Sequence, residues 1–512
     1  MRKITKGDPM GATLTSFYFL CFLLAVLVVY YVCPGRFRWV ILLLSSIAYY
    51  LLSGNGILLV YPLITCTIAF FGGKYIDTHK PAGKKALVVT ILLILAPLFA
   101  LKYINFLINT INFIPKVEIP NTKWLVPLGI SFYTFTILGY VIDIYNGIAK
   151  RQENYFKLLT FGMYFPTMLS GPIMKYREDG EQFFTEHKLD YKNITFGAQR
   201  MLWGFFETLV ISERMRMIAD SVYNDVTAYQ GAFIFFGTVC YAVQLYTNFS
   251  GCMDIVLGIS EMLGLKLPEN FDRPYFSKNI SEYWRRWHIT LGVWMKEYVF
   301  YPVLRTSFFN NLQSKLKAKY NKKTAKRLTT FLAMFILWFT VGVWHGGDWK
   351  YVIGSGLLHW FYIVMGELIS PKVDNLLTKI HIDPKAKWVD VLRCVRTFLL
   401  VCLGLVFFRA SSVGDAVTLI KNTFTVWNIR YLFTGAIFCM GIDWVDFVVA
   451  VVSIGILITV SALRSKGSIR DRIALKKLPI RWIIWFALLF YTILLGFYGP
   501  GFSAAEFIYQ GF

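Results

Sequence analysis

The sequence has few charged residues for its length. Only 16% of its 512 residues are charged, while 56% are apolar and 18% are aromatic. These proportions exclude an ordinary soluble domain. No soluble domain separates from the rest by composition, and no repeat of fixed period is present. We therefore expect residues 1–512 to form a single helical membrane domain.

Cysteine pairs with metal-ligand spacing are also missing. The eight cysteines are scattered, and none belongs to a Cys-x-x-Cys pair or a Cys/His cluster. Neither a disulfide framework nor a zinc site is indicated, so we expect no metal and no bound cofactor. The cysteines are interpreted as small packing residues.

Acidic residues are scarce beside basic ones, 30 against 53, which gives a net charge of +23. The basic residues gather in short loops between apolar segments, as in cytoplasmic loops of membrane proteins, so no nucleic-acid partner is expected. The loop Gln313–Arg327 holds seven lysines or arginines and no acid. We interpret it as a solvated determinant of topology. It is also suited to attract anionic lipid, a nucleotide-bearing thioester or an acidic carrier protein.

Apolar runs long enough to span a membrane recur throughout the chain. The sequence predicts an all-α polytopic membrane protein with about 11–13 transmembrane helices and short re-entrant or interfacial helices around a central tunnel. Expected spans lie near 16–32, 38–53, 56–72, 86–101, 124–141, 197–212, 231–248, 329–345, 351–367, 389–408, 444–463 and 482–498. Shorter apolar pieces near 158–170 and 291–304 are expected to be re-entrant or tilted, and 158–178 to help form the tunnel wall.

The basic loops predict an orientation. Four expected spans separate Gln313–Arg327 from Arg464–Arg481, an even number, so both loops can face the cytoplasm. The same parity places the N-terminus outside the cell. It also sends residues 498–512 outside as an extracytoplasmic C-terminal tail.

A histidine at the end of an apolar run is the first candidate for chemistry. His345 follows the run Thr329–Trp344, and sixteen helical residues rise roughly 24 Å against a hydrocarbon core of roughly 30 Å. An ionisable side chain at that depth is costly unless it faces protein or a wet cavity. Histidine also takes and returns a proton near neutral pH. His345 is therefore a candidate general base, although a buried, hydrogen-bonded helix-end histidine is the plainer reading. The two glycines after it are expected to leave backbone open for a substrate.

A second histidine closes a polar and aromatic stretch, Asn270–His288. Asn279 followed by Glu282 predicts a helix start, which would place Trp284, Arg285 and His288 on neighbouring turns. The arginine pair Arg285 and Arg286 either anchors at the membrane interface or holds a pyrophosphate or carboxylate.

Polar side chains also end an apolar span at Asn248-Phe-Ser-Gly-Cys-Met-Asp254. Asn248, Ser250 and Asp254 either hydrogen-bond between helices or line the path of the acyl group or its acceptor.

These stretches resemble the signature regions of the membrane-bound O-acyltransferase family, in particular its bacterial branch that modifies extracellular polysaccharides. That branch includes alginate O-acetylation proteins and, more distantly, teichoic-acid D-alanylation proteins. The resemblance covers most of the chain in the right order. The matching pieces are Val126–Phe135, Phe165–Ile173, Asn248–Asp254, Arg273-Pro-Tyr, Trp284-Arg-Arg-Trp-His288, Val343-Trp-His-Gly, Phe407-Phe-Arg-Ala410 and Phe507–Phe512.

The resemblance implies a membrane O-acyltransferase that moves an acyl group, most simply acetyl, from a cytoplasmic thioester across the membrane to a polysaccharide. The donor would be acetyl-CoA or the phosphopantetheine of an acyl carrier protein. His288 resembles the family's second tunnel histidine, and we place Trp344 with the substrate-binding candidates. Such transfer needs a base, oxyanion stabilisation and exclusion of water.

The C-terminal tail is either an interfacial aromatic anchor or part of the reaction. Its resemblance to the terminal motif of polysaccharide-modifying relatives implies that Tyr509 carries the acyl group as an ester to an extracytoplasmic acyltransferase or esterase-like partner. The expected location is the bacterial plasma membrane, with membrane lipid as the surrounding partner. Two other functions stay open: D-alanyl transfer from a carrier protein to teichoic acid, and a polysaccharide or lipid transporter or flippase.

Overall fold

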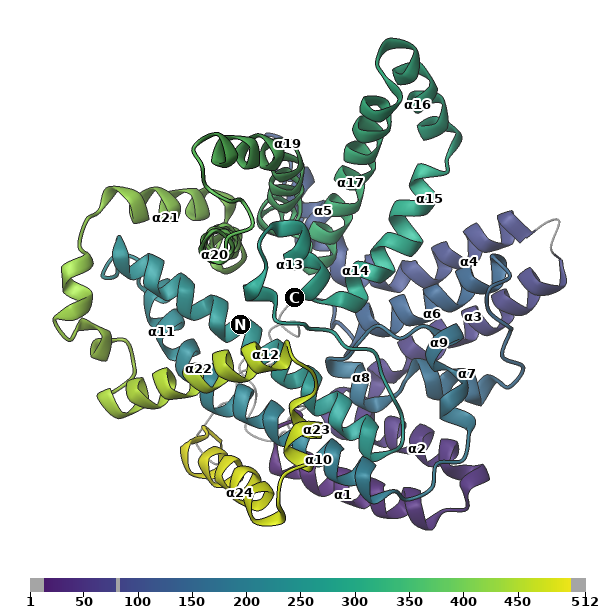
Figure 1. Ribbon diagram of the computed structural model, residues 1–512. Coiled ribbons are helices and arrows are strands. Elements are labelled where there is room, and N and C mark those ends of the chain that lie inside the picture. Colours follow the sequence, from purple (N-terminus) through teal and green to yellow (C-terminus); the bar gives the residue numbers. More distant parts are fainter. Residues whose placement is uncertain (1–12, 80–82, 499–512) are drawn as a thin grey trace. The chain divides into compact units, whose positions relative to one another are not determined.

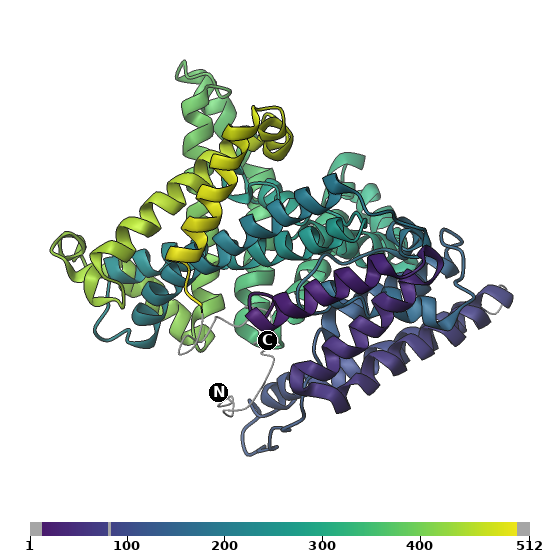
Figure 2. The same cartoon turned by 90° about the horizontal axis from the view of Figure 1, so that it is seen from below.

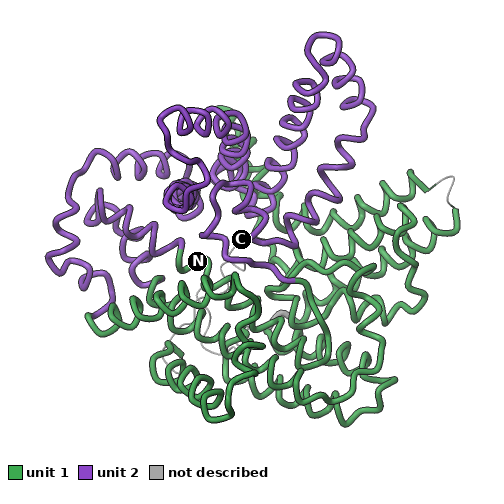
Figure 3. Tube along the Cα trace, in the orientation of Figure 1, with its two compact units in different colours: residues 1–215, 243–268, 444–512 green, residues 216–242, 269–443 purple. Residues whose placement is uncertain are grey.

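The computed structural model describes residues 13–79 and 83–498 as helices joined by loops (Figure 1). Phe271 and Trp287 pair as an isolated antiparallel bridge. The described chain divides into two compact units (Figure 3). Unit 1 holds residues 1–215, 243–268 and 444–512, and unit 2 holds 216–242 and 269–443. The single domain expected from the sequence stays a prediction.

Unit 1 holds the N-terminal helices and the last three helices. Its helices are α1 Phe17–Val32, α2 Arg38–Tyr50, α3 Val60–Thr78, α4 Gly83–Leu98, α5 Ile104–Ile111, α6 Ile130–Tyr145, α7 Tyr155–Gly162, α8 Phe165–Leu169, α9 Tyr176–Asp179, α10 Tyr191–Phe205, α22 Trp444–Arg464, α23 Ile469–Ala474 and α24 Leu478–Leu495. Helices α3, α4 and α6 pack on one another (Figures 1 and 2).

Unit 2 holds the helices that carry both candidate histidines. They are α13 Ile280–Arg286, α14 Ile289–Met295, α15 Tyr301–Leu304, α16 Ser307–Lys319, α17 Lys322–Gly346, α18 Trp349–Tyr351, α19 Leu358–Lys379, α20 Lys387–Arg409 and α21 Val413–Thr425. Helices α11 Glu213–Asn224 and α12 Ala232–Met262 have residues in both units.

Within the described residues, nine helical stretches are long and apolar enough to cross a membrane. They are Gly35–Ser53, Gly56–Thr78, Gly83–Ile111, Ala232–Met262, Lys322–Gly346, Trp349–Lys379, Lys387–Arg409, Trp444–Arg464 and Leu478–Leu495. Two shorter apolar helices, α1 and α6, match two further expected spans. The chain is an all-α, multi-pass membrane protein, as the sequence predicts.

One expected span differs from the rest. Residues 197–212 are helical and belong to α10 and to the π-helical segment η7 Phe206–Ser212 that continues it. They are not among the spans named above. Arg200 and Glu207 interrupt the apolar run there. This helix instead packs inside unit 1 through glycine contacts with α12.

Those contacts set how closely the two helices approach. A Cβ at Gly204 would lie 2.4 Å from the carbonyl oxygen of Gly251, and one at Gly197 would lie 2.4 Å from that of Gly258. Close backbone contact through small residues is a common way for membrane helices to associate. The α10–α12 pair therefore requires glycine at these positions.

The segment expected to be re-entrant consists of short helices. Residues 158–174, which include most of α7 and all of α8, are buried. Arg177 donates to both carboxylate oxygens of the buried Asp143, at 3.1 and 3.2 Å. Irregular backbone in a membrane protein is tolerated where protein covers it, as here. The tunnel wall expected from 158–178 stays a prediction.

Candidate active site

The last turn of α17 carries His345. The helix begins after Asn321, whose side chain accepts from the backbone N–H of Thr324 at 2.8 Å, and ends at Gly347 in the left-handed region. Such an asparagine cap and a left-handed glycine stop are usual at the two ends of a helix. His345 is therefore fixed one residue before the helix terminus, and only 3% of its surface is exposed.

The two glycines after His345 have different roles from the one expected. A Cβ at Gly346 would lie 2.5 Å from the ring of Tyr351, so this glycine allows close packing. Gly347 has φ 59° and its N–H donates to the carbonyl oxygen of Val343. The expectation of open backbone for a substrate is wrong at Gly346, because the Tyr351 ring occupies that space.

Aromatic rings surround the His345 imidazole. Its ring centroid lies 5.5 Å from that of Phe408 on α20 and 5.1 Å from that of Trp344. Phe408 belongs to the Phe407-Phe-Arg-Ala410 motif, so two motifs singled out in the sequence meet at this histidine.

His288 contacts the same indole. It lies between α13 and α14 with φ 45° and ψ 54°, and it is 1% exposed. Its imidazole centroid lies 5.7 Å from the ring of Trp344. The two candidate histidines, 57 positions apart in the sequence, therefore share one aromatic neighbour.

The two histidines differ in backbone conformation, and the burial of His288 sets its protonation state. Burial lowers the pKa of His288 to about 3, because a charged imidazole loses its hydration there. His288 is thus neutral at physiological pH, when it has one N–H donor and one acceptor nitrogen. It is better suited to orient a group by hydrogen bonding than to hold a proton.

A third buried histidine touches the other predicted residues. The indole N–H of Trp284 donates to Nδ1 of His359 at 3.2 Å, and the Trp284 ring lies 4.7 Å from that of Trp338. His359 is 5% exposed and lies within the span Trp349–Lys379. It is not among the candidates predicted from the sequence. The rule that marks His345, an ionisable group inside an apolar span, would have marked His359 as well.

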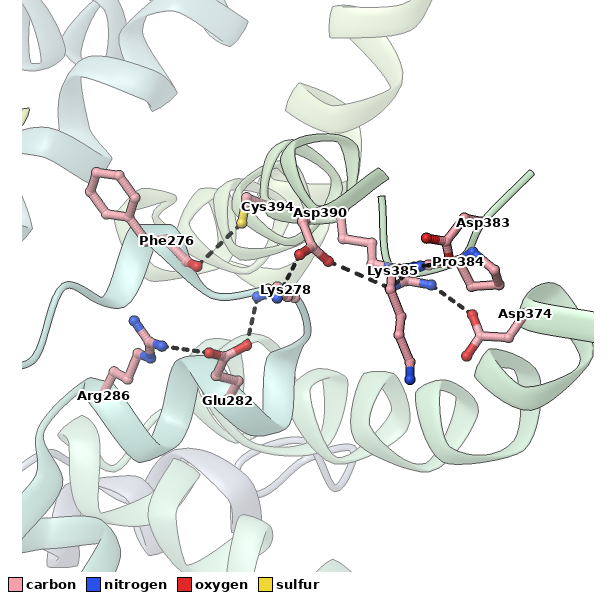
Figure 4. Close-up of polar contacts among 11 residues, drawn as sticks. Phe276, Lys278, Glu282, Arg286, Asp374, Asp383, Pro384, Lys385, Asp390 and Cys394 are labelled. Carbon is pink, nitrogen blue, oxygen red and sulfur yellow. Dashed lines mark hydrogen bonds and ion pairs between the residues drawn. The ribbon is translucent and has the colours of Figure 1, made fainter. Parts of the chain in front are cut away.

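Ion pairs fasten α13 to its neighbours in unit 2 (Figure 4). The expected start of α13 is confirmed, since Asn279 accepts from the N–H of Glu282 at 2.8 Å. Glu282 in turn accepts from the backbone N–H of Lys278 at 2.9 Å and pairs with Arg286 at 2.6 Å. Lys278 reaches Asp390 of α20 at 2.7 Å.

A second part of this network joins α20 to α19. Arg393 pairs with Asp374 at 2.6 Å and donates to the carbonyl oxygen of Pro384 at 2.9 Å (Figure 4). Together the contacts hold α13, which carries Trp284 and the arginine pair, against two membrane helices. In that pair, Arg286 forms an ion pair with Glu282, whereas Arg285 is exposed.

The three polar candidates on α12 belong to unit 1. Asp254 accepts from Arg200 of α10 at 2.7 Å, and Ser250 hydrogen-bonds Glu207. Glu207 also accepts from the Trp203 indole at 2.9 Å. Asn248, like these groups, is buried. Sequence reasoning missed Glu207, although a carboxylate within an expected span was a sufficient signal.

The role of Tyr509 and the absence of a metal stay predictions. Tyr509 and the tail from 499 onward lie outside the described residues. Within 13–79 and 83–498, no group of three or more His, Cys, Asp or Glu side chains has an arrangement that could hold a metal ion.

Comparison with known proteins identifies a family for part of the chain. Residues 148–318 match the model of the membrane-bound O-acyltransferase family (MBOAT). A probable alginate O-acetylase AlgI of Azotobacter vinelandii is 29% identical over 414 residues, covering 78% of this chain and 76% of that protein.

Two other relatives act on different polymers. A peptidoglycan O-acetyltransferase of Helicobacter pylori is 29% identical, covering 70% of this chain and 69% of its own length. A teichoic acid D-alanyltransferase of Bacillus subtilis is 29% identical, covering 61% and 74% respectively. The family match includes His288 but ends before His345.

Proposed function

We propose that this chain moves an acetyl group from a cytoplasmic thioester to a hydroxyl on a cell-surface or exported polysaccharide. The premise is that the chain carries a domain of the membrane-bound O-acyltransferase family and is itself an O-acyltransferase. The observation that carries the proposal is the pair of buried imidazoles, His345 and His288, in contact with one indole, that of Trp344. A water-poor aromatic setting around two histidines suits acyl transfer, since it protects a thioester from hydrolysis.

His345 acts as the general base in this proposal. It takes the proton of the attacking hydroxyl as the oxygen bonds to the thioester carbonyl carbon. The tetrahedral oxyanion then collapses and breaks the carbon–sulfur bond. The departing thiolate takes the proton back from His345, so atoms and charge balance over the step. His288, neutral and buried, orients the donor or the acceptor by a hydrogen bond.

The donor is acetyl-CoA or the phosphopantetheine of an acyl carrier protein. In this proposal Arg285 binds its phosphate groups, which is supported by the exposure of Arg285 beside the ion-paired Arg286. Trp284 and Trp344 form the aromatic surroundings of the acyl path. Asn248, Ser250 and Asp254 are assigned to the acceptor path or to helix packing within unit 1.

The acyl group leaves through the tail in this proposal. The attacking hydroxyl is then the phenol of Tyr509: a histidine takes its proton, the acyl group forms an aryl ester as the thiol of the donor leaves, and transfer to a nucleophile of an extracytoplasmic acyltransferase or esterase-like partner returns the free phenol. The protein sits in the bacterial plasma membrane, with both termini outside the cell.

Two alternative functions differ from acetyl transfer in the donor that they require. D-alanyl transfer to teichoic acid is favoured by the Bacillus subtilis relative and would require a carrier-protein donor. A polysaccharide or lipid transporter would move its cargo without consuming a thioester.

Mass spectrometry of the C-terminal peptide separates these functions. The purified protein is incubated in nanodiscs with acetyl-CoA, or with acetylated or D-alanylated carrier protein, and the peptide containing Tyr509 is analysed. We expect a mass increase of one acetyl group in the wild type and none in Tyr509→Phe. A D-alanyl adduct would support the first alternative. Thioester consumption without any adduct would remove the tyrosine relay and keep the transferase, whereas no consumption of any donor would contradict the proposed function.

A further inference from the structure

The backbone of His288 has a left-handed conformation, and a segment that pairs with it through backbone hydrogen bonds holds it in place. His288 is a non-glycine residue with φ 45°, a strained conformation that persists only where surrounding contacts fix it. Those contacts come from residues 270–272. The N–H of Ile289 donates to the carbonyl oxygen of Asn270 at 3.0 Å, and the N–H of Asp272 donates to that of Arg286 at 2.9 Å.

The side chain of Asn270 makes three more contacts at the same place. Asn270 is 1% exposed, and its Oδ1 lies 3.1 Å from the backbone nitrogen of Thr290 and 3.0 Å from the Thr290 hydroxyl. It also lies 3.2 Å from Nδ1 of His288. One amide oxygen therefore contacts both the imidazole of the strained residue and the residue two positions after it.

These contacts fix the position of a proton on His288. A backbone N–H can only donate, so the Asn270 atom facing Thr290 must be the amide oxygen rather than the amide nitrogen. That oxygen can only accept, so Nδ1 of His288 must carry the hydrogen. A neutral imidazole carries one N–H, which leaves the basic lone pair on Nε2.

We infer that Asn270 is a positioning residue that holds His288 in its Nδ1–H tautomer and so presents Nε2 as a hydrogen-bond acceptor to the reacting groups. The role of Nε2 toward the reacting groups rests on the proposed acyl transfer, whereas the tautomer of His288 does not. An acceptor nitrogen at this position suits a group that donates, such as a hydroxyl of the acceptor other than the attacking one. His288 would then orient the acceptor, while His345 removes the proton of the attacking hydroxyl.

The first test needs no acyl transfer. Nitrogen-15 magnetic resonance of histidine-labelled protein in nanodiscs reports which ring nitrogen is protonated, and the His288 signals are assigned by their loss in His288→Gln. We expect the Nδ1–H form in the wild type and in Asn270→Asp, which keeps an acceptor oxygen, and a mixture of both tautomers in Asn270→Ala. A wild-type His288 protonated on Nε2 would overturn the inference whether or not the protein transfers acyl groups.

The second test separates positioning from folding. With kcat expressed per folded molecule, Asn270→Ala should lower kcat about 10–100-fold, the range found when a partner that orients a metal-bound histidine is removed, while Asn270→Asp restores most of it. The matched control is Asn112→Ala, another asparagine whose Oδ1 accepts from a backbone N–H, that of Ile119, at 2.9 Å. It should change neither kcat nor the His288 signals. A purely structural Asn270 would lower the thermal stability of Asn270→Ala and leave kcat per folded molecule unchanged, and that result would also overturn the inference.

Discussion

At the scale of single residues, the two site histidines are held by different kinds of backbone. His345 lies in the regular last turn of α17, whereas His288 has a left-handed conformation between two short helices. The regular position requires little support from other segments. The left-handed one depends on Asn270 and on the bridge between Phe271 and Trp287. This difference is consistent with the proposed roles, in which His345 is the base on a regular helix and His288 is the orienting group in a loop between two helices.

The two neighbouring arginines provide a prediction at the same scale. Arg285→Ala should raise the KM for the thioester donor about tenfold or more, because hydrogen bonds to charged groups contribute about 1.5–3 kcal/mol. Arg286→Ala is the matched control. It breaks the pair with Glu282 and should change stability by about 1 kcal/mol or less, with a smaller effect on KM, because this pair is partly exposed. Steady-state kinetics of the wild type and both variants measures this KM. A KM for Arg285→Ala equal to that of the wild type would contradict a donor-binding role for Arg285.

At the scale of helices, packing between α10 and α12 depends on glycine. A Cβ at position 251 would lie 2.4 Å from the hydroxyl oxygen of Thr208 and 2.7 Å from the carbonyl oxygen of Gly204. The same helix pair carries the hydrogen-bonded groups around Glu207 and Asp254. The close approach therefore keeps buried polar groups of unit 1 in contact.

Gly251→Ala should lower the thermal stability of the protein, by about 1–3 kcal/mol in unfolding free energy, as overpacking of a filled interior does. Gly455→Ala in α22 is the control, because a Cβ there meets nothing within 4 Å. It should be neutral or slightly stabilising through helix propensity. Thermal unfolding in the same detergent measures both, and equal midpoints would show that the α10–α12 contact adapts freely.

Most helices could be predicted from the sequence, because a membrane span is encoded by a local run of apolar residues. The start of α13 was also predictable, since Asn279 and Glu282 are three residues apart. The contact of Trp284 with His359 was not, because 75 positions separate the two side chains. Residues 197–212 are helical as predicted, but their packing was not predictable for a related reason. Their apolar side chains pack within unit 1 beside Arg200 and Glu207, and hydropathy alone does not distinguish protein from lipid as the surroundings.

At the scale of the whole molecule, the candidate groups are distributed over two compact units. Unit 2 brings together His345, His288 and Trp344, while unit 1 holds the polar cluster of α12. The membrane-bound O-acyltransferase match covers the first part of the site and stops before His345. The catalytic assignment therefore depends on the chemistry of His345 itself, and a direct test of that residue is the decisive one.

Single-turnover release of free thiol from the donor is that test. The wild type and His345→Ala are compared in nanodiscs with equal amounts of folded protein. General-base catalysis typically contributes 10²–10⁴-fold, so the account predicts that His345→Ala releases thiol at least about 100-fold more slowly while keeping its thermal stability. Equal rates of thiol release in the two proteins would contradict it.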